Sequence, residues 1–277
     1  SNTAPTRFVE SDGTRFAYRR FGEPIGAPIV LLQHFMGNLD NYDPAVTDVL
    51  AMGREVVLTD NAGVGLSTGA APATVAGMAR DAASLIDALR LEHVDLFGFS
   101  MGGHVVQQIA VDRPELVRRL VLVGTGPRGG DGMDQLAPDV VPLFRTACEP
   151  QDLMWLPIFF SPSEASQATG RRFLERIRAR TDDRDVAVSE ATIAAHLAAA
   201  HEWGTAAPHS FDYLKGIPHS ALVVNGSNDI VVPTINSFIL QQNLPNAELI
   251  LFPDSNHGSH FQFAQLFTRY VTDFVDR

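Results

Sequence analysis

The chain has 277 residues, 45% of them hydrophobic, which is enough to bury a substantial core in one large domain or in one domain with an inserted module. Its 32 acidic residues outnumber the 21 basic ones, and this acidic balance without a basic run excludes the usual electrostatic basis for binding nucleic acid or an anionic membrane. The single cysteine, Cys148, excludes an intrachain disulfide, and without a signal peptide or an apolar run of membrane-spanning length we expect a cytoplasmic protein.

The first part of the chain alternates strand and helix patterns. Segments 7–11 and 14–22 flank an Asp-Gly pair and predict a β-hairpin. Continuous apolar runs predict strands that are buried on both faces, at 28–34, 54–60, 93–99 and 117–125. Helical spacing predicts helices at 75–91 and at 102–113, the second ending before a proline. Such repeated β-α-β units indicate an α/β fold with a mostly parallel sheet covered by helices.

The alternation stops between residues 126 and 216, where helical patterns cover 138–148, 163–180 and 188–203. It resumes with a strand at 220–226, a helix near 234–242, a strand at 247–253 and a final helix at 260–275. Ordinary loops rarely exceed about 15 residues, so we expect 126–216 to be an inserted helical module. The sheet domain would then consist of 1–125 and 217–277.

The stretch "GFSMG" places Ser100 in a G-x-S-x-G motif between a predicted buried strand and a predicted helix. In that context the glycines relieve steric clashes around a strained serine, and the hydroxyl projects from the carboxyl edge of the sheet. The serine is therefore predicted to be a nucleophile, although a plain turn serine would fit the same letters.

A serine hydroxyl is a weak nucleophile that needs a base, and the base needs an acid to orient it. His257 follows the last predicted strand and is the preferred base, with His260 as the alternative. Asp229 follows the strand at 220–226 and is the preferred acid, ahead of Asp60 and Asp254. Both preferred residues are expected at the edge of the sheet that carries Ser100.

An oxyanion intermediate needs two hydrogen-bond donors. One is expected from the amide of Met101, the residue after the nucleophile, and the other from the loop after the strand at 28–34, where Phe35 is the preferred residue.

Five segments together resemble the α/β-hydrolase family over essentially the whole chain: "QHFMG" (33–37), "DNAGVGLS" (60–67), "GFSMGG" (98–103), "NGSNDIVVP" (225–233) and "SNHGSHFQ" (255–262). The resemblance implies an eight-stranded, mostly parallel sheet, with Ser100 as nucleophile, Asp229 as acid and His257 as base. It also makes 126–216 a helical cap, or lid, over the active site.

Two positions depart from the family pattern. Phe35 stands after His34 where the family usually has a glycine, which bears on the choice of oxyanion donor. Ala62 stands where an arginine is usual, and we expect this change to affect structure more than chemistry.

The resemblance favours a serine hydrolase of the esterase or haloperoxidase-like branch, cleaving an ester or related acyl bond of a small, largely apolar substrate. Pocket residues are expected among His34, Trp155, Phe159, Phe160 and Trp203, although the aromatic ones would equally suit the packing of a cap core.

Three alternatives remain at this stage. A cofactor-free haloperoxidase or perhydrolase keeps the same triad, and a carbon–carbon bond hydrolase would need cations such as Arg145, Arg171 or Arg172 to hold an acidic substrate. A receptor-like relative would bind a ligand without turnover. We expect no cofactor and no metal, because neither metal-ligand spacing nor a phosphate-binding glycine loop is present. The expected partner is a small-molecule substrate, and nothing in the sequence specifies an oligomeric state.

Overall fold

A computed structural model describes residues 1–145 and 151–277, except the side chains of Arg145 and Gln151. Cys148 and the end of the helix expected at 138–148 lie outside the described residues. The centre of the molecule is an eight-stranded sheet in the order β1-β2-β4-β3-β5-β6-β7-β8. Its strands are β1 (Arg7–Ser11), β2 (Thr14–Gly22), β3 (Ile29–Leu32), β4 (Glu55–Thr59), β5 (Val94–Phe99), β6 (Val117–Val123), β7 (Ser220–Gly226) and β8 (Ala247–Phe252).

The predicted hairpin is confirmed as β1 and β2, which pair antiparallel around a turn in which Asp12 and Gly13 both have positive φ. Strand β2 also pairs antiparallel with β4, whereas all pairs from β4 through β8 are parallel. The parallel strands β3 and β5 are buried at every residue, and β6 is buried at all residues except Arg118 and Arg119, as expected of strands covered on both faces.

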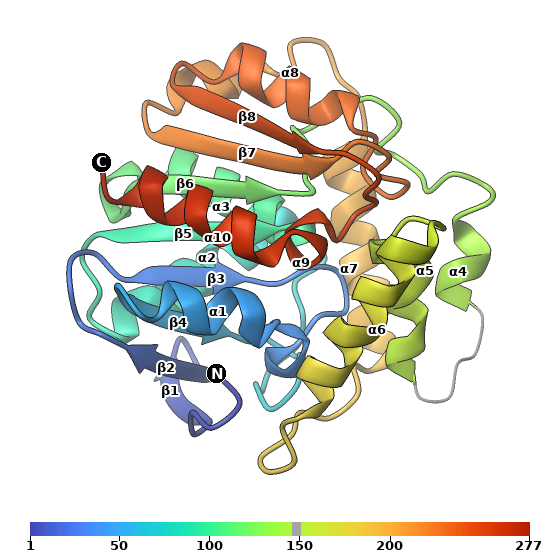
Figure 1. Cartoon of the computed structure of the whole chain (residues 1–277). Helices are drawn as coiled ribbons and strands as arrows, with labels where there is room; N and C mark the ends of the chain where they lie inside the picture. The colour runs from blue at the N-terminus through green and yellow to red at the C-terminus, as the bar shows by residue number, and fades with distance from the viewer. Residues whose placement is uncertain (146–150) are drawn as a thin grey trace.

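Helices cover both faces of the sheet, and an apolar layer is buried between the helices and the sheet on each face. One layer packs α2 (Val75–Ala88), α3 (Met101–Asp112) and α8 (Ile235–Asn243) against the sheet. The opposite layer packs α1 (Pro44–Leu50) and α10 (Ala264–Val275), which Figure 1 shows in front of the strands. The helix expected at 260–275 is divided in the structure, because Phe263 leaves the helical conformation between the short α9 (Ser259–Gln262) and α10.

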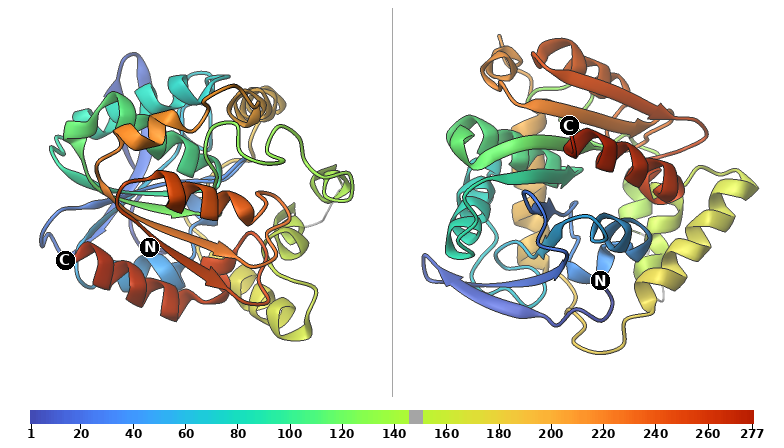
Figure 2. Two further views of the ribbon diagram at one scale, coloured as in Figure 1. Left: turned by 90° about the horizontal axis from the view of Figure 1, so that it is seen from above. Right: turned by 60° about the vertical axis from the view of Figure 1, so that its left-hand side comes forward.

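The segment between β6 and β7 contains helices and no strand among its described residues, as the sequence predicts. These are α4 (Val141–Arg145), α5 (Trp155–Phe159), α6 (Glu164–Arg178) and α7 (Glu190–Gly204). We refer to 126–216 as the helical insertion. Figures 1 and 2 show its helices beyond the ends to which the parallel strands point.

The helical insertion is bound to the sheet domain through both apolar layers and through polar contacts. Trp203 of α7 belongs to the layer of α2 and α3, whereas Phe159 of α5 belongs to the layer of α1 and α10. Buried Asp40 accepts hydrogen bonds from Arg19 of β2 and from the side chain of Arg184, which lies in the insertion. The insertion therefore forms part of the same packed structure as the strand ends beneath it.

Within the part of the chain that the structure describes, no helix is both long and apolar enough to cross a membrane.

Candidate active site

Ser100 occupies a sharp turn between β5 and α3. Its backbone angles, φ 55° and ψ −118°, lie in a region that non-glycine residues rarely adopt and that costs about 1–3 kcal/mol. The turn is held in the sheet because the Ser100 amide donates to the Val123 carbonyl at 2.8 Å. The surrounding structure thus stabilises a strained serine at the carboxyl edge of the sheet.

Glycines around Ser100 let α3 approach the strands closely. A Cβ atom on Gly102 would lie 2.2 Å from the carbonyl oxygen of Leu32 in β3. A Cβ atom on Gly98 would lie 2.4 Å from the Gly102 carbonyl oxygen, and one on Gly103 would lie 2.5 Å from Thr125. Packing therefore explains why glycines surround Ser100. Each glycine permits a close contact that fixes the turn at Ser100 against β3, α3 or Thr125.

Asp229 and His257 lie at the same edge, as predicted. Asp229 follows β7, and its carboxylate accepts hydrogen bonds from the amides of Val231 and Val232 at 2.9 and 3.0 Å through Oδ1. Its Oδ2 lies 2.8 Å from Nδ1 of His257, which follows β8. Both side chains are buried. The pairing leaves Nε2 of His257 as the nitrogen that can exchange a proton with another group.

The other candidates have different partners. Asp254 accepts hydrogen bonds from Ser161 and Ser163 of the helical insertion at 2.5 and 2.6 Å. His260 lies in α9 with its ring 4.4 Å from that of Phe99. Asp60 accepts from the amide of Leu39. The structure therefore pairs the preferred base with the preferred acid.

The loop that carries His257 is fastened to α5 of the helical insertion. Gly258 donates its amide to the Phe159 carbonyl at 2.9 Å, and a Cβ atom on Gly258 would lie 2.4 Å from the Phe159 Cβ. Asn256 donates its side-chain amide to the carbonyls of Phe160 and Pro157 at 3.2 and 3.3 Å. The residues on both sides of His257 are thus fixed by one short helix.

In the loop after β3, one of the amides from His34 to Gly37 has no acceptor in the described part of the chain. The amide of His34 donates to the Gln33 side chain, that of Met36 to Nδ1 of His196, and that of Gly37 to the His34 carbonyl. The amide of Phe35 has no such acceptor among the described residues. The left-handed residue of this loop is Met36, with φ 63°, so Phe35 needs no glycine-like conformation.

Met101 begins α3, so its amide lacks a partner within the helix. Both Phe35 and Met101 line the cavity that also contains Ser100. This places the two predicted oxyanion donors and the predicted nucleophile around one space.

That cavity has a volume of about 300 Å³ and is bounded on one side by the helical insertion. Most of its wall is apolar, and five polar side chains interrupt it: Ser100, His104, Asp134, Gln135 and His201. The remaining lining residues are Met133, Leu136, Phe144, Leu197, Ala200, Val231 and Val232. No Arg or Lys lines the cavity within the described part of the chain. An anionic ligand would therefore lack a counter-charge from these residues.

The residues expected in the pocket lie elsewhere. Trp155, Phe159 and Phe160 pack in the apolar layer of α1 and α10, and Trp203 packs in the layer of α2 and α3. The ring of His34 is buried edge-on against Trp155 and Phe159. These aromatic side chains are large and apolar enough for either a pocket wall or a packed core. In the structure they pack in the core and support the His257 loop, while other residues face the cavity.

Three buried histidines, His34, His104 and His260, lie close enough to His257 for its charge to affect their pKa values. Burial lowers the pKa of His34 and of His104 to about 3, and lowers the pKa of His260 well below its usual value. Repulsion by His257 adds to the depression of the pKa in all three. The surroundings of His257 therefore contain neutral rings and no additional positive histidine at neutral pH.

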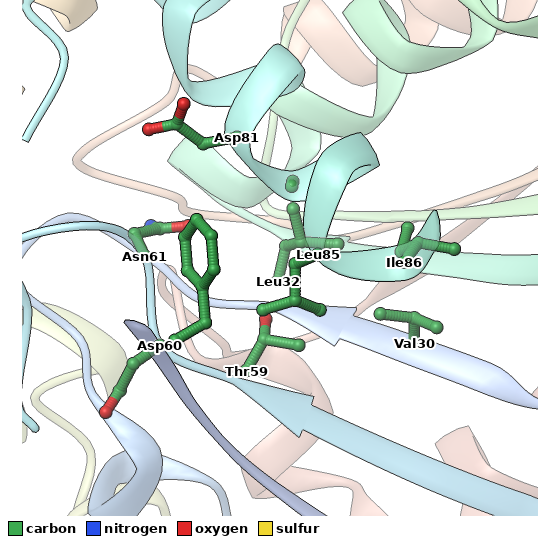
Figure 3. Close-up of a pocket in the computed structure, with 10 residues that line it drawn as sticks. Val30, Leu32, Thr59, Asp60, Asn61, Asp81, Leu85 and Ile86 are labelled. Carbon is green, nitrogen blue, oxygen red and sulfur yellow. The ribbon is translucent and has the colours of Figure 1, made fainter. Parts of the chain in front are cut away.

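A second, much smaller cavity lies between α2 and the strands β3 and β4 (Figure 3). Its volume is about 10 Å³, so it has room for no more than about one water molecule. Figure 3 shows the carboxyl groups of Asp60 and Asp81 directed away from the apolar side chains that form its floor. This gap is a packing feature, and Ser100 is not among its lining residues. The described residues contain no group of three His, Cys, Asp or Glu side chains arranged to hold a metal.

Sequence reasoning missed most of the cavity wall. The glycine-rich stretch before Met133 gave a signal, since Gly129 and Gly132 have positive φ and turn the chain across the site. Leu197 and Ala200 lie on a predicted helix whose orientation could not be read from its pattern. The structure also places His104 of α3 on the cavity wall.

Comparison with known proteins agrees with this fold. The alpha/beta hydrolase fold family matches residues 27–264. An alpha/beta hydrolase fold protein from Chitinophaga pinensis is 41% identical, with a TM-score of 0.92 over 99% of this chain and 98% of that one. A 2-hydroxy-6-oxononadienedioate/2-hydroxy-6-oxononatrienedioate hydrolase from Paraburkholderia xenovorans is 27% identical, over 97% of this chain and 93% of that protein. An N-acyl homoserine lactone degrading enzyme is 25% identical, with a TM-score of 0.73 over 97% of this chain and all of that one.

The chain therefore belongs to the α/β-hydrolase fold family. Its relatives are hydrolases of small organic molecules, which makes this chain a hydrolase.

Proposed function

We propose that this hydrolase cleaves an ester or related acyl bond of a small, uncharged and largely apolar substrate through an acyl-enzyme on Ser100. The observation that carries the proposal is the placement of Ser100. It is a strained serine on the wall of an apolar cavity of about 300 Å³, beside the amides of Phe35 and Met101.

The proposed reaction has two halves. In the first, His257 takes the hydroxyl proton of Ser100 through Nε2, the serine oxygen attacks the acyl carbonyl, and the alcohol leaves with that proton. In the second, His257 takes a proton from water, the resulting nucleophile attacks the acyl-enzyme, and the acid departs as the serine regains its proton. Asp229 holds the imidazole through Nδ1 and stabilises its charged form in both halves.

The amides of Phe35 and Met101 are the proposed donors to the oxyanion. The hydrogen bonds of the loop support the choice of Phe35, because the three other amides from His34 to Gly37 already have acceptors. Preorganised amides in a dry site contribute most when charge develops on the carbonyl oxygen. In this account the helical insertion acts as the cap, because its residues close one side of the cavity.

The charge of the cavity wall favours an ester over a dicarboxylate. The Paraburkholderia relative is named for hydrolysis of dienedioates, which carry two carboxylates, and such a substrate would need cationic partners here. Among the described lining residues, the acidic Asp134 is the only Asp, Glu, Lys or Arg. Arg171 and Arg172 lie on α6 and outside the cavity wall, and the Arg145 side chain lies outside the described residues.

The test is a series of p-nitrophenyl esters from acetate to decanoate, measured with the wild-type protein and with Ser100→Ala. We expect turnover that favours short and medium chains, and a loss of at least about a thousandfold in kcat for Ser100→Ala. A p-nitrophenyl monoester of glutarate, which ends in a carboxylate, should be a poorer substrate than the hexanoate ester.

Two of the alternative reactions have outcomes of their own in companion assays. Turnover of a 2-hydroxy-6-oxo-dienoate without turnover of any ester would favour carbon–carbon bond hydrolysis. Peracid formation from a carboxylic acid and peroxide, at a rate above ester hydrolysis, would favour a perhydrolase. Ester turnover that is unchanged in Ser100→Ala would contradict the proposal.

A further inference from the structure

His104 lines the cavity that contains Ser100, and its ring contains two buried nitrogen atoms that no described residue uses. It lies in α3, four positions after Ser100, and lines the same cavity. Only 5% of the residue is exposed, and neither Nδ1 nor Nε2 has a hydrogen-bond partner among the described residues. Burial of polar atoms without partners is unfavourable, so a histidine at this position needs an explanation.

Packing alone does not explain it. The His104 ring stacks on Trp203 with centroids 5.2 Å apart and planes 17° apart. Phenylalanine could make the same stack without burying any polar atom. Two other buried histidines use one ring nitrogen each for the loop after β3, His34 at the Phe35 carbonyl and His196 at the Met36 amide. His104 makes no contact of this kind.

The chemical state of His104 defines what it can bind. Burial lowers its pKa to about 3, so the ring is neutral at neutral pH and has one donor nitrogen and one acceptor nitrogen. A neutral ring offers a hydrogen bond to an ether, carbonyl or hydroxyl oxygen without attracting a carboxylate in particular. This matches a cavity whose described wall contains no Arg or Lys.

Resting on the acyl hydrolysis proposed above, we infer that His104 is a specificity-determining residue that binds an uncharged oxygen of the substrate close to the reacting carbonyl. Ser100 and His104 line the same cavity of about 300 Å³, and attack on the carbonyl requires the serine oxygen about 3–3.5 Å from the carbonyl carbon. The bound oxygen therefore lies within a few bonds of the ester, on the acyl or the alcohol side. The substrate class is an oxygen-substituted ester of otherwise apolar character.

Two pairs of esters test this inference, each differing by one oxygen in place of one methylene. The acyl pair is p-nitrophenyl methoxyacetate and p-nitrophenyl butyrate; the alcohol pair is 2-methoxyethyl butyrate and butyl butyrate. For each variant, the kcat/KM of the oxygen-containing ester is divided by that of its partner. This ratio does not depend on the amount of folded enzyme, because both esters are measured with the same preparation. Comparing the ratio of a variant with that of the wild type removes the difference in intrinsic reactivity between the two esters.

We expect His104→Phe, which preserves the stack on Trp203, to lower this ratio about tenfold in at least one pair. His104→Asn, which retains a donor and an acceptor, should restore part of it. His93→Phe is the matched control: His93 is exposed, precedes β5 and lies outside the described cavity wall, so both ratios should stay at the wild-type value.

Ratios for His104→Phe within twofold of the wild type in both pairs would overturn the inference while leaving acyl hydrolysis intact. Failure of the wild type to hydrolyse butyl and p-nitrophenyl butyrate in a Ser100-dependent manner would instead overturn the proposed function, and the inference with it.

Discussion

Gly102→Ala tests whether the close approach of α3 to β3 positions the reaction. A Cβ atom at this position would lie 2.2 Å from the Leu32 carbonyl oxygen and 2.6 Å from the Leu32 carbonyl carbon. Cβ atoms do not normally approach within about 3.0 Å of such atoms, so α3 and β3 must separate by about 0.8 Å. This movement would change the separation between the two proposed oxyanion donors, because Met101 moves with α3 and Phe35 follows β3.

The expected magnitudes follow from that displacement. Forcing a methyl group into a filled backbone contact costs about 3 kcal/mol, which for a chain of this length corresponds to a decrease of about 5 °C in Tm. A misplacement of about 1 Å at a reacting centre costs about a hundredfold in rate. We therefore expect Gly102→Ala to fold with reduced stability and to lose most of its kcat.

The assay compares thermal unfolding and kcat for p-nitrophenyl butyrate in Gly102→Ala and Gly216→Ala. Gly216 is the matched control, because a Cβ atom there would have nothing within 4 Å and the backbone does not have positive φ. Its stability should stay within about 0.5 kcal/mol of the wild type. Equal Tm and kcat values in the two variants would refute the reasoning.

Three further substitutions test other parts of the site. Asp229→Asn can still accept hydrogen bonds from the amides of Val231 and Val232 but cannot hold His257 in the required tautomer, so kcat should fall about 10⁴-fold. A loss of kcat below tenfold would contradict the role of the Asp229–His257 pair. Burial and the facing carboxyl of Asp185 raise the pKa of Asp60, so the folded state binds more protons than the unfolded state and stability falls as pH rises above the usual carboxyl range. Asp60→Asn should remove this slope above the usual carboxyl range in chemical unfolding, and a pH dependence parallel to the wild type would rule out the explanation. Asn256→Ala loses two hydrogen bonds to the helical insertion and should lower stability by about 1–3 kcal/mol together with kcat, whereas a wild-type melting curve and rate would show that these bonds do not position the His257 loop.

The sheet and the edge that carries the site could be predicted because each of their signals is local. A continuous apolar run predicts a parallel strand that is buried on both faces, and the residues after it lie at the carboxyl edge of the sheet. Ser100, Asp229 and His257 each follow a predicted strand, so strand order was not needed to bring them to one edge. The hairpin was equally local, since Asp12-Gly13 sets its turn.

The cavity wall could not be predicted because it depends on how the helices of the insertion pack. Trp203 and Leu197 lie on the same helix, and their apolar character is equal evidence for a core or for a pocket. Packing buries Trp203 and leaves Leu197 on the cavity wall. Helix α5 escaped prediction because it is short and contains Pro157, so no helical period develops.

Two departures from the family pattern have structural explanations. Phe35 can replace the usual glycine because the positive φ of its loop falls on Met36. Ala62 is buried in the apolar layer of α2 and α3, where its small side chain fits.

The central claim is that Ser100 is the nucleophile, and covalent labelling tests it most directly. The wild-type protein is treated with a fluorophosphonate, digested, and analysed by mass spectrometry, with Ser100→Ala treated in parallel. The account predicts a single adduct on Ser100 that forms in step with the loss of esterase activity and is absent from the variant. Complete loss of activity with the adduct on another residue, or full labelling of the variant, would contradict it.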